Sequence, residues 1–215
     1  EQSLFQSLNL QNVGPTVMSG RVVDVDVNPE NPTEFYVGYA SGGLWYSNNN
    51  GMSFVPVMDS APTQNVGDIA IDWKNGTIWV GTGEVNSSRS SYAGIGILRS
   101  DDKGKTWKNL GLTDSHHISR IVINPANPNE VVVGVVGHLY TKNEERGIYK
   151  TTDGGKTWSK TLFVNDQTGI IDVAVSPKNF KIQYAAAWTK DRKAWDFKGS
   201  GATSGIYRSE DAGLT

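Results

Sequence analysis

One eight-residue pattern recurs along the chain and constrains its fold more than any other feature. Each copy reads Ser/Thr-x-Asp/Asn-x-Gly and places an aromatic residue three positions after the glycine. The copies begin at Ser47, Ser100, Thr151 and Ser209, and the fourth reaches Thr215 before its aromatic position. A period of about 50 residues indicates a repeat architecture, in which each unit buries its apolar faces against its neighbours.

The pattern has the composition of a tight turn. Asp or Asn accepts hydrogen bonds from nearby backbone N–H groups, and Gly adopts positive φ. The aromatic residue can cover the hairpin and bury against its own unit. The acidic stretch 101–104 lacks the spaced oxygen ligands of a calcium loop, so we expect a structural role. The pattern residues are Ser47, Asn49, Gly51 and Phe54; Ser100, Asp102, Gly104 and Trp107; Thr151, Asp153, Gly155 and Trp158; and Ser209, Asp211 and Gly213.

Short β-prone runs precede every copy. The third unit, for example, contains RIVINP, EVVVGVV and RGIYKT. No window of helical length shows an apolar period of 3.6 residues, which predicts an all-β chain. Four short strands in a unit of about 50 residues are typical of a four-stranded antiparallel β-propeller blade. With the strands lettered A to D from the central channel outward, the pattern falls in the C–D hairpin.

The repeat positions divide the chain into one propeller segment, residues 1–215. We expect blades at 19–63, 64–114, 115–166 and 167–215, the last one incomplete. Residues 1–18 are expected to hold an outer closing strand and a lead-in, because Phe5-Gln6-Ser7-Leu8 is similar to the start of strand D in the second unit. The interrupted fourth copy favours the N-terminal part of a larger propeller. The alternative is a four-bladed ring closed by residues 4–10.

Composition removes several classes of protein. The chain has 20 Lys and Arg against 22 Asp and Glu, a net charge of −2, which argues against a nucleic-acid partner. No apolar run approaches the roughly 18 residues of a membrane span. The absence of Cys excludes a disulfide scaffold and a Cys-ligated metal site. The N-terminal residues lack the features of a signal peptide, so we expect any such peptide to have been removed. No cofactor is expected.

The recurring pattern is identified as the Asp box of bacterial neuraminidase (BNR) repeats. The chain resembles the N-terminal propeller of large exported proteins grouped with the sortilin/Vps10 domains, which are often labelled "glycosyl hydrolase, BNR repeat". This resemblance implies more than four blades and a secreted or cell-surface location. The matching stretches, which cover nearly all of residues 19–211, are SGRVVDVDVNPENP, GYASGGLWYS, GTGEVNSSRSSYAGIGILRSDDKGKTW, GHLYTKNEERGIYKTTDGGKTW and VNDQTGIIDVAVSP.

Three of the four B–C connections are long, polar and rich in aromatic residues. The first unit has only a short turn at 40–43, whereas the others have 83–92, 137–146 and 189–204. Such loops on one face of a rigid scaffold usually carry function. Aromatic rings could stack on a ligand, and Arg could bind its carboxylate in bidentate fashion. The ligand-binding candidates on and near this face are Arg21, Arg89, Tyr92, His117, His138, Arg146, Arg192 and Trp195.

For each charged loop residue there is also a structural interpretation, in which Glu84, Arg89, Glu145 and Arg146 pair with one another. If Arg146 instead binds a ligand, Arg146→Ala should weaken binding and preserve the fold. We expect no metal site, because the adjacent His116 on a strand would point away from His117 and no third ligand lies at a recognisable spacing.

Two comparisons with glycosidases bear on catalysis. Xyloglucan-cleaving propellers of similar first-blade sequence carry a catalytic Asp immediately before the matching Ser-Gly-Gly stretch, where this chain has Ala40, which can neither donate a proton nor activate water. Arg21 is placed like an early sialidase Arg, without the Pro of that motif. The weak catalytic candidates are Glu84, Glu144, Glu145 and Asp191.

Two hypotheses follow. The first is a non-catalytic module of an exported or cell-surface protein that binds a peptide, protein or glycan on the long-loop face. The alternative is a sialidase- or xyloglucanase-like glycoside hydrolase, with a carboxylate pair drawn partly from outside this segment.

Overall fold

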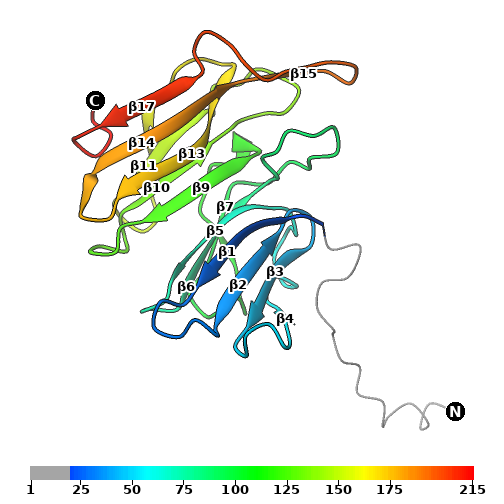
Figure 1. The fold of residues 1–215 in the computed structure, drawn as a ribbon, viewed down its shortest axis with the longest axis vertical. Coiled ribbons are helices and arrows are strands. Elements are labelled where there is room, and N and C mark those ends of the chain that lie inside the picture. The colour runs from blue at the N-terminus through cyan, green and yellow to red at the C-terminus, as the bar shows by residue number, and fades with distance from the viewer. Residues whose placement is uncertain (1–19) are drawn as a thin grey trace, which may run out of the picture.

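The computed structural model describes residues 20–215, which form a row of antiparallel sheets (Figure 1). Three sheets have four strands, the fourth has three, and a two-stranded hairpin stands apart. The strands are β1 (Val22–Val27), β2 (Phe35–Tyr39), β3 (Gly43–Ser47) and β4 (Val55–Pro56) in the first blade; β5 (Val66–Asp72), β6 (Thr77–Thr82), β7 (Ile97–Ser100) and β8 (Lys108–Asn109) in the second; β9 (Ile118–Ile123), β10 (Val131–Val135), β11 (Gly147–Thr151) and β12 (Ser159–Leu162) in the third; β13 (Thr168–Ser176), β14 (Asn179–Thr189) and β17 (Gly205–Ser209) in the fourth; and β15 (Asp191–Arg192) with β16 (Phe197–Lys198) in the hairpin.

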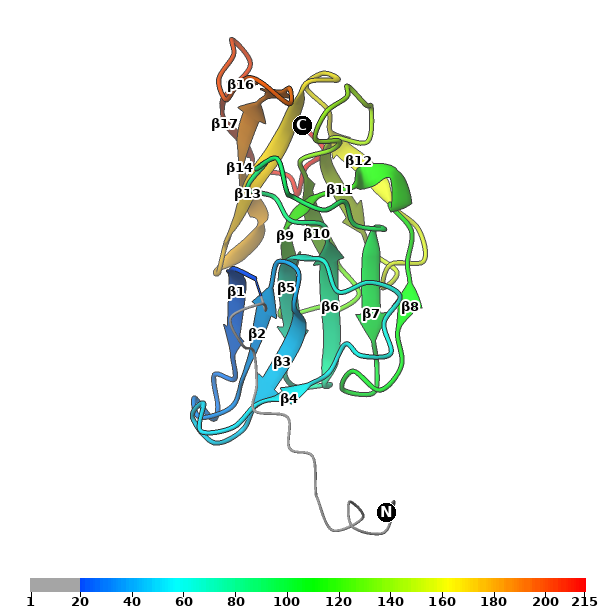
Figure 2. The same cartoon turned by 90° about the vertical axis from the view of Figure 1, so that its right-hand side faces the viewer.

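These sheets confirm the predicted partial propeller of four-stranded blades. Strands within each sheet pair in chain order, as in a meander, and Figure 2 shows β5, β6, β7 and β8 of the second blade side by side in this order. The first strands of successive blades, β1, β5, β9 and β13, lie next to one another. The sheets fall inside the expected blades 19–63, 64–114, 115–166 and 167–215, although the limits themselves stay a prediction. The expected closing strand in residues 1–18 lies outside the described residues. In the described part of the chain, no helix is long and apolar enough to cross a membrane.

Polar side chains connect the inner strands of neighbouring blades. Asp26 accepts a hydrogen bond from the N–H of Ile71 at 2.8 Å, and Asp68 accepts one from Ile121 at 2.6 Å. Between the third and fourth blades, the Ser119 hydroxyl donates to a carbonyl of β13 at 2.6 Å. Because these donors and acceptors are paired across blade boundaries, the blades are held in a defined register around the channel.

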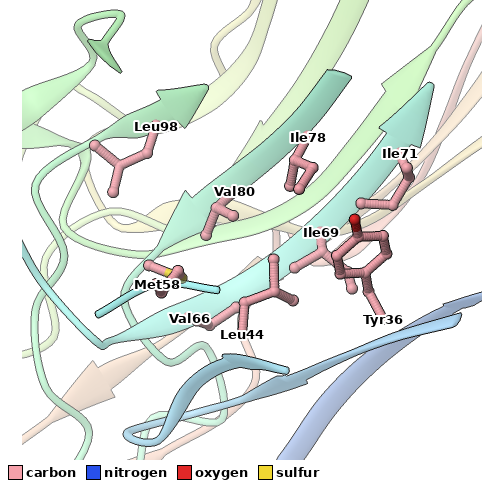
Figure 3. Close-up of a cluster of buried hydrophobic side chains, with 9 residues drawn as sticks. All are labelled: Tyr36, Leu44, Met58, Val66, Ile69, Ile71, Ile78, Val80 and Leu98. Atoms are coloured by element: carbon pink, nitrogen blue, oxygen red, sulfur yellow. The ribbon is translucent and has the colours of Figure 1, made fainter. Parts of the chain in front are cut away.

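The apolar cores lie between blades rather than inside any one of them. Figure 3 shows the first such core, where Tyr36 and Leu44 of the first blade face Ile69 and Val80 of the second. Equivalent clusters lie between the second and third blades and between the third and fourth. A sheet only one layer thick can bury its faces only against its neighbours, which explains why the repeat pattern determines the architecture.

All four Asp boxes form the same turn between strands C and D. The box hydroxyl accepts a hydrogen bond from the glycine N–H and donates one to the Asp or Asn, and each box glycine has positive φ. The hydroxyl-to-glycine distances are 2.9 Å for Ser47–Gly51, 2.8 Å for Ser100–Gly104, 2.9 Å for Thr151–Gly155 and 2.8 Å for Ser209–Gly213.

Two of the box aromatic residues contact the preceding blade. Trp107 donates its indole N–H to the carbonyl of Val57 at 3.2 Å, and Trp158 donates to Leu110 at 2.8 Å. Both acceptors belong to the preceding blade, so the tryptophans join blades as well as cover their own hairpins. The contact with the preceding blade was not predicted; Phe54, by contrast, packs edge-on against Phe35 of its own blade. The tryptophans reach the preceding blade because an isolated blade offers no second layer against which an indole can pack.

Candidate functional site

The three long B–C loops meet on one face. Tyr140 donates its hydroxyl to the carbonyl of Arg89 at 3.0 Å, and Arg89 donates to Ala194 at 3.2 Å. Arg192 donates its Nε to the carbonyl of Ser87 at 3.0 Å. We call this assembly, residues 83–96, 136–146 and 189–204, the long-loop face. In Figure 1, the β15–β16 hairpin, a feature that the sequence did not predict, projects on the same side as the connection between β6 and β7.

Three aromatic side chains of the long-loop face are clearly exposed. Trp195 is 84% exposed, Tyr92 is 59% exposed, and Tyr140, whose hydroxyl is bound to the Arg89 carbonyl, is 45% exposed. Phe197 is less available, because its ring packs edge-on against Trp188 and lies 4.4 Å beneath the guanidinium of Arg192. The face therefore displays several aromatic rings, of which Trp195 and Tyr92 are the most exposed, and Arg192 is held against Phe197.

Arg146 lies inside the loop rather than on its surface. It is only 2% exposed, and its guanidinium donates to the carbonyls of Val136 (2.7 Å), His138 (2.9 Å) and Thr141 (2.9 Å). Burial lowers the pKa of Arg146 to about 10. The expectation that this residue orients a ligand carboxylate needs correction, because its donors already hold the backbone of its own loop.

Two further basic groups are buried under the face. Lys190, which the sequence analysis missed, is 3% exposed and donates to the carbonyl of His138 at 2.8 Å. Burial, with Arg146 nearby, lowers the pKa of Lys190 to about 7. His117 is 2% exposed, and burial lowers its pKa to about 3, so its imidazole is neutral. His117 therefore has no open side for a ligand, which also corrects the sequence-based expectation.

The ion pairs that the sequence predicts among the charged loop residues do not form in the structure. Glu84 is 4% exposed and forms an ion pair with Arg21, whose side chain is half exposed. No ion pair joins Glu84, Arg89, Glu145 and Arg146 to one another among the described residues. Tertiary structure decides these pairings, because Arg21 precedes β1 in the first blade and Glu84 follows β6 in the second.

The other catalytic candidates remain at the surface. Glu144 is exposed, Glu145 accepts a hydrogen bond from Asn143 at 3.4 Å, and Asp191 pairs with Lys193 at 3.0 Å. Ala40 is buried and donates its N–H to the carbonyl of Arg21, so no carboxylate occupies that position.

Asp114, His116 and His138 converge beside the long-loop face. Asp114 lies in the 3₁₀ turn η2 (Thr113–Ser115), and its Oδ1 is 3.6 Å from Nε2 of His116 and 3.2 Å from Nε2 of His138. The two imidazoles are stacked, with ring centroids 3.7 Å apart. Burial and the neighbouring His138 lower the pKa of His116. The sequence analysis considered His116 only together with His117 and expected no metal site; in the structure His117 is buried, and His116 lies instead beside Asp114 and beside His138 of another loop.

The comparisons with known proteins agree with this architecture. A family model described as BNR/Asp-box repeat matches residues 149–160, the third Asp box with its flanking strands. The chain has a β-propeller fold and carries a BNR/Asp-box repeat. It is also 27% identical over 139 residues to the "Probable oligoxyloglucan-reducing end-specific xyloglucanase" of Neosartorya fischeri, covering 60% of this chain and 15% of that enzyme.

Solved structures share the fold of this BNR-repeat propeller. An ancestral GH74 enzyme covers 88% of the chain with a TM-score of 0.60 and 21% identity, and the GH74 xyloglucanase from Xanthomonas campestris covers 92% with 0.62 and 18%. The chain spans 27% and 30% of these two proteins. YCF48 bound to D1 peptide covers 86% of the chain, with a TM-score of 0.51 and 13% identity, and the chain spans 55% of it.

Proposed function

We propose that this protein is a glycoside-hydrolase-like propeller that binds a polysaccharide across the long-loop face. The observation that carries the proposal is the exposure of Trp195 and Tyr92 on loops that support one another. Sugar rings present apolar C–H faces, which pack on exposed aromatic rings, while neighbouring polar groups fix their orientation. The xyloglucanase relatives favour this reading over a peptide or protein ligand.

The charges of the site favour a neutral glycan over an acidic one. Arg146 and Lys190 are buried and donate to backbone carbonyls, so they do not form a carboxylate clamp. Arg192 donates to the Ser87 carbonyl and stacks on Phe197. A sialidase-like function would need free guanidinium groups at the surface. Arg146 and Arg192 are engaged as described, and the exposed Arg89 donates to the carbonyl of Ala194.

Hydrolysis would also require a pair of catalytic carboxylates at a suitable separation. A glycosidase pair is about 5–5.5 Å apart in retaining enzymes and about 6.5–9.5 Å apart in inverting ones. Glu84 is buried and forms an ion pair with Arg21. Of the catalytic candidates, only Glu144, Glu145 and Asp191 are therefore carboxylates at the surface. We infer that this segment provides the binding face and that remaining blades of the same chain complete the carboxylate pair. On the resemblance described above, we also propose a secreted or cell-surface location and a sortilin/Vps10-like relationship.

Affinity electrophoresis in gels containing xyloglucan, or an unsubstituted β-glucan, tests the proposal. We expect the protein to be retarded by a polysaccharide, and Trp195→Ala to remove most of that retardation. Phe163→Ala is the matched control, because Phe163 is also exposed (44%) but follows β12, outside the long-loop face. Equal migration of all variants with and without polysaccharide would refute the binding proposal. Release of reducing sugar, measured separately, tests hydrolysis.

A further inference from the structure

We propose that Asp114, His116 and His138 form a binding site for a transition-metal ion of the Zn²⁺ class, independent of the proposed glycan binding. Two imidazole nitrogens and one carboxylate oxygen are a donor set that suits Zn²⁺. The ligand atoms of the three residues lie within 4.8 Å of one another, and no second such group occurs in residues 20–215. Three protein ligands leave one coordination position open to water or to a ligand.

The separations around Asp114 fit such an ion. With Zn–N and Zn–O bonds of about 2.0–2.1 Å, neighbouring ligand atoms on a tetrahedron are about 3.3 Å apart. Oδ1 of Asp114 is 3.2 Å from Nε2 of His138 and 3.6 Å from Nε2 of His116. The carboxylate oxygen is therefore already at ligand spacing from both rings. The side chain of Asp114 is 63% exposed, so an ion can enter from solvent.

His138 is oriented in the way that metal-binding imidazoles require. Its Nδ1 lies 2.8 Å from the hydroxyl of Thr141, and its Nε2 faces Asp114, 3.1 Å from the backbone carbonyl and 3.2 Å from Oδ1, so an ion bound at Nε2 would replace the hydrogen bond to that carbonyl. A hydrogen bond at the second ring nitrogen sets the tautomer and orientation of a metal-binding His. Asn143 accepts from the N–H of His138 at 3.0 Å and donates to the carbonyl of Asp114 at 3.4 Å. It thus links the two segments that carry the ligands.

His116 is held in an unusual backbone conformation. Its φ of 57° and ψ of −43° lie outside the regions that L-residues normally adopt. Such a conformation persists only where the surroundings enforce it, and it is common at binding sites. Here the His116 carbonyl accepts from the N–H of Gly94 at 2.6 Å, and a Cβ on Gly83 would lie 1.8 Å from the same oxygen. The backbone thereby places the His116 ring against His138 and leaves the neighbouring His117 buried.

One movement is required for binding. The rings of His116 and His138 are nearly parallel, with an interplanar angle of 17°, so their lone pairs do not converge on a single point. The side chain of His116 is 35% exposed and that of His138 is 18% exposed. We therefore expect His116 to rotate out of the stack when the ion binds, while His138 and Asp114 keep their positions.

Titration of the metal-stripped, untagged full-length protein with Zn²⁺ alone, by calorimetry, tests the site. We expect one ion per chain. A group that hydrogen-bonds a metal ligand typically accounts for about 10–100-fold in metal affinity, so Thr141→Val, which removes the partner of His138 Nδ1, should weaken binding by about that factor. Loss of a ligand in Asp114→Asn or His116→Asn should cost about 100-fold or more. Asp166→Asn is the matched control. Asp166 pairs with Lys142, in the loop that carries His138, but it is not one of the three proposed metal ligands.

The outcomes separate a specific site from surface binding. The proposal is supported if Zn²⁺ binds with one-to-one stoichiometry, Asp166→Asn matches the natural protein, and the ligand variants lose affinity while keeping its urea-unfolding midpoint. It is overturned if no Zn²⁺ binds at micromolar concentration, if several ions bind weakly, or if Asp114→Asn and Thr141→Val bind as the natural protein does. Visible absorption of the Co²⁺-loaded protein provides a second readout of imidazole coordination.

Discussion

Replacing Arg146 with Met would test whether this residue holds the third B–C loop together. The guanidinium donates three hydrogen bonds to carbonyls of its own loop and is 2% exposed. Hydrogen bonds to a charged group contribute roughly 1.5–3 kcal/mol each. Burial lowers the pKa of Arg146 to about 10, which corresponds to roughly 3 kcal/mol of charge burial and offsets part of that gain. We expect a net loss of about 3 kcal/mol for Arg146→Met.

Urea unfolding monitored by tryptophan fluorescence measures this loss, and limited proteolysis shows whether the loop 136–146 opens first. Arg89→Met is the matched control, because Arg89 is exposed and donates to a single carbonyl. That change should stay within about 0.5 kcal/mol of the natural protein. Equal midpoints for the two variants, with the loop still resistant to protease, would refute the structural role of Arg146. The earlier prediction for Arg146→Ala, weakened binding with an intact fold, is replaced by this one.

Three further predictions concern the blades and the loops. Trp158→Phe should lose about 1 kcal/mol, for one hydrogen bond to the preceding blade, and Trp158→Ala about 3 kcal/mol, both measured by urea unfolding. Hydrogen bonds from Thr106 lower the pKa of Asp102 to about 2 in the folded protein. Because the unfolded chain then takes up the proton at higher pH than the folded one, the free energy of unfolding should fall as pH drops from about 4 to 2. Asp102→Asn should flatten the pH profile of the urea-unfolding midpoint over that range. Gly83→Ala should displace the His116 segment, since φ there is +89° and a Cβ would meet the His116 carbonyl; an unchanged thermal midpoint and unchanged amide exchange at 115–117 would contradict this.

Much of the fold could be predicted because its signals are local. The box residues Asp153 and Gly155 form their turn with partners at most four positions away, and the alternation of β-prone runs with turns needs no knowledge of other blades. The interlocking of the loops was not predictable in detail. Tyr140 and Arg89 are 51 residues apart, and only the angle between blades brings their groups into contact.

The candidate site shows the same division. Sequence reasoning found the three long loops and the exposed Trp195 and Tyr92, because loop length and composition are visible in the chain itself. It placed Arg146 and His117 on the surface, since a basic or imidazole side chain in a polar loop is usually exposed. It also missed Lys190 and the approach of Asp114 to His138, which are 24 residues apart and belong to different connections.

The repeat, the all-β blade, the turn in each Asp box and the shared face of the long loops all follow from the order of residues along the chain. Tertiary structure alone decided which polar side chains are buried and which are free, and which groups from separate blades meet. The physical reason is range. Turn chemistry and strand periodicity act over a few residues, whereas burial, ion pairing and metal-ligand geometry depend on how one blade packs against the next.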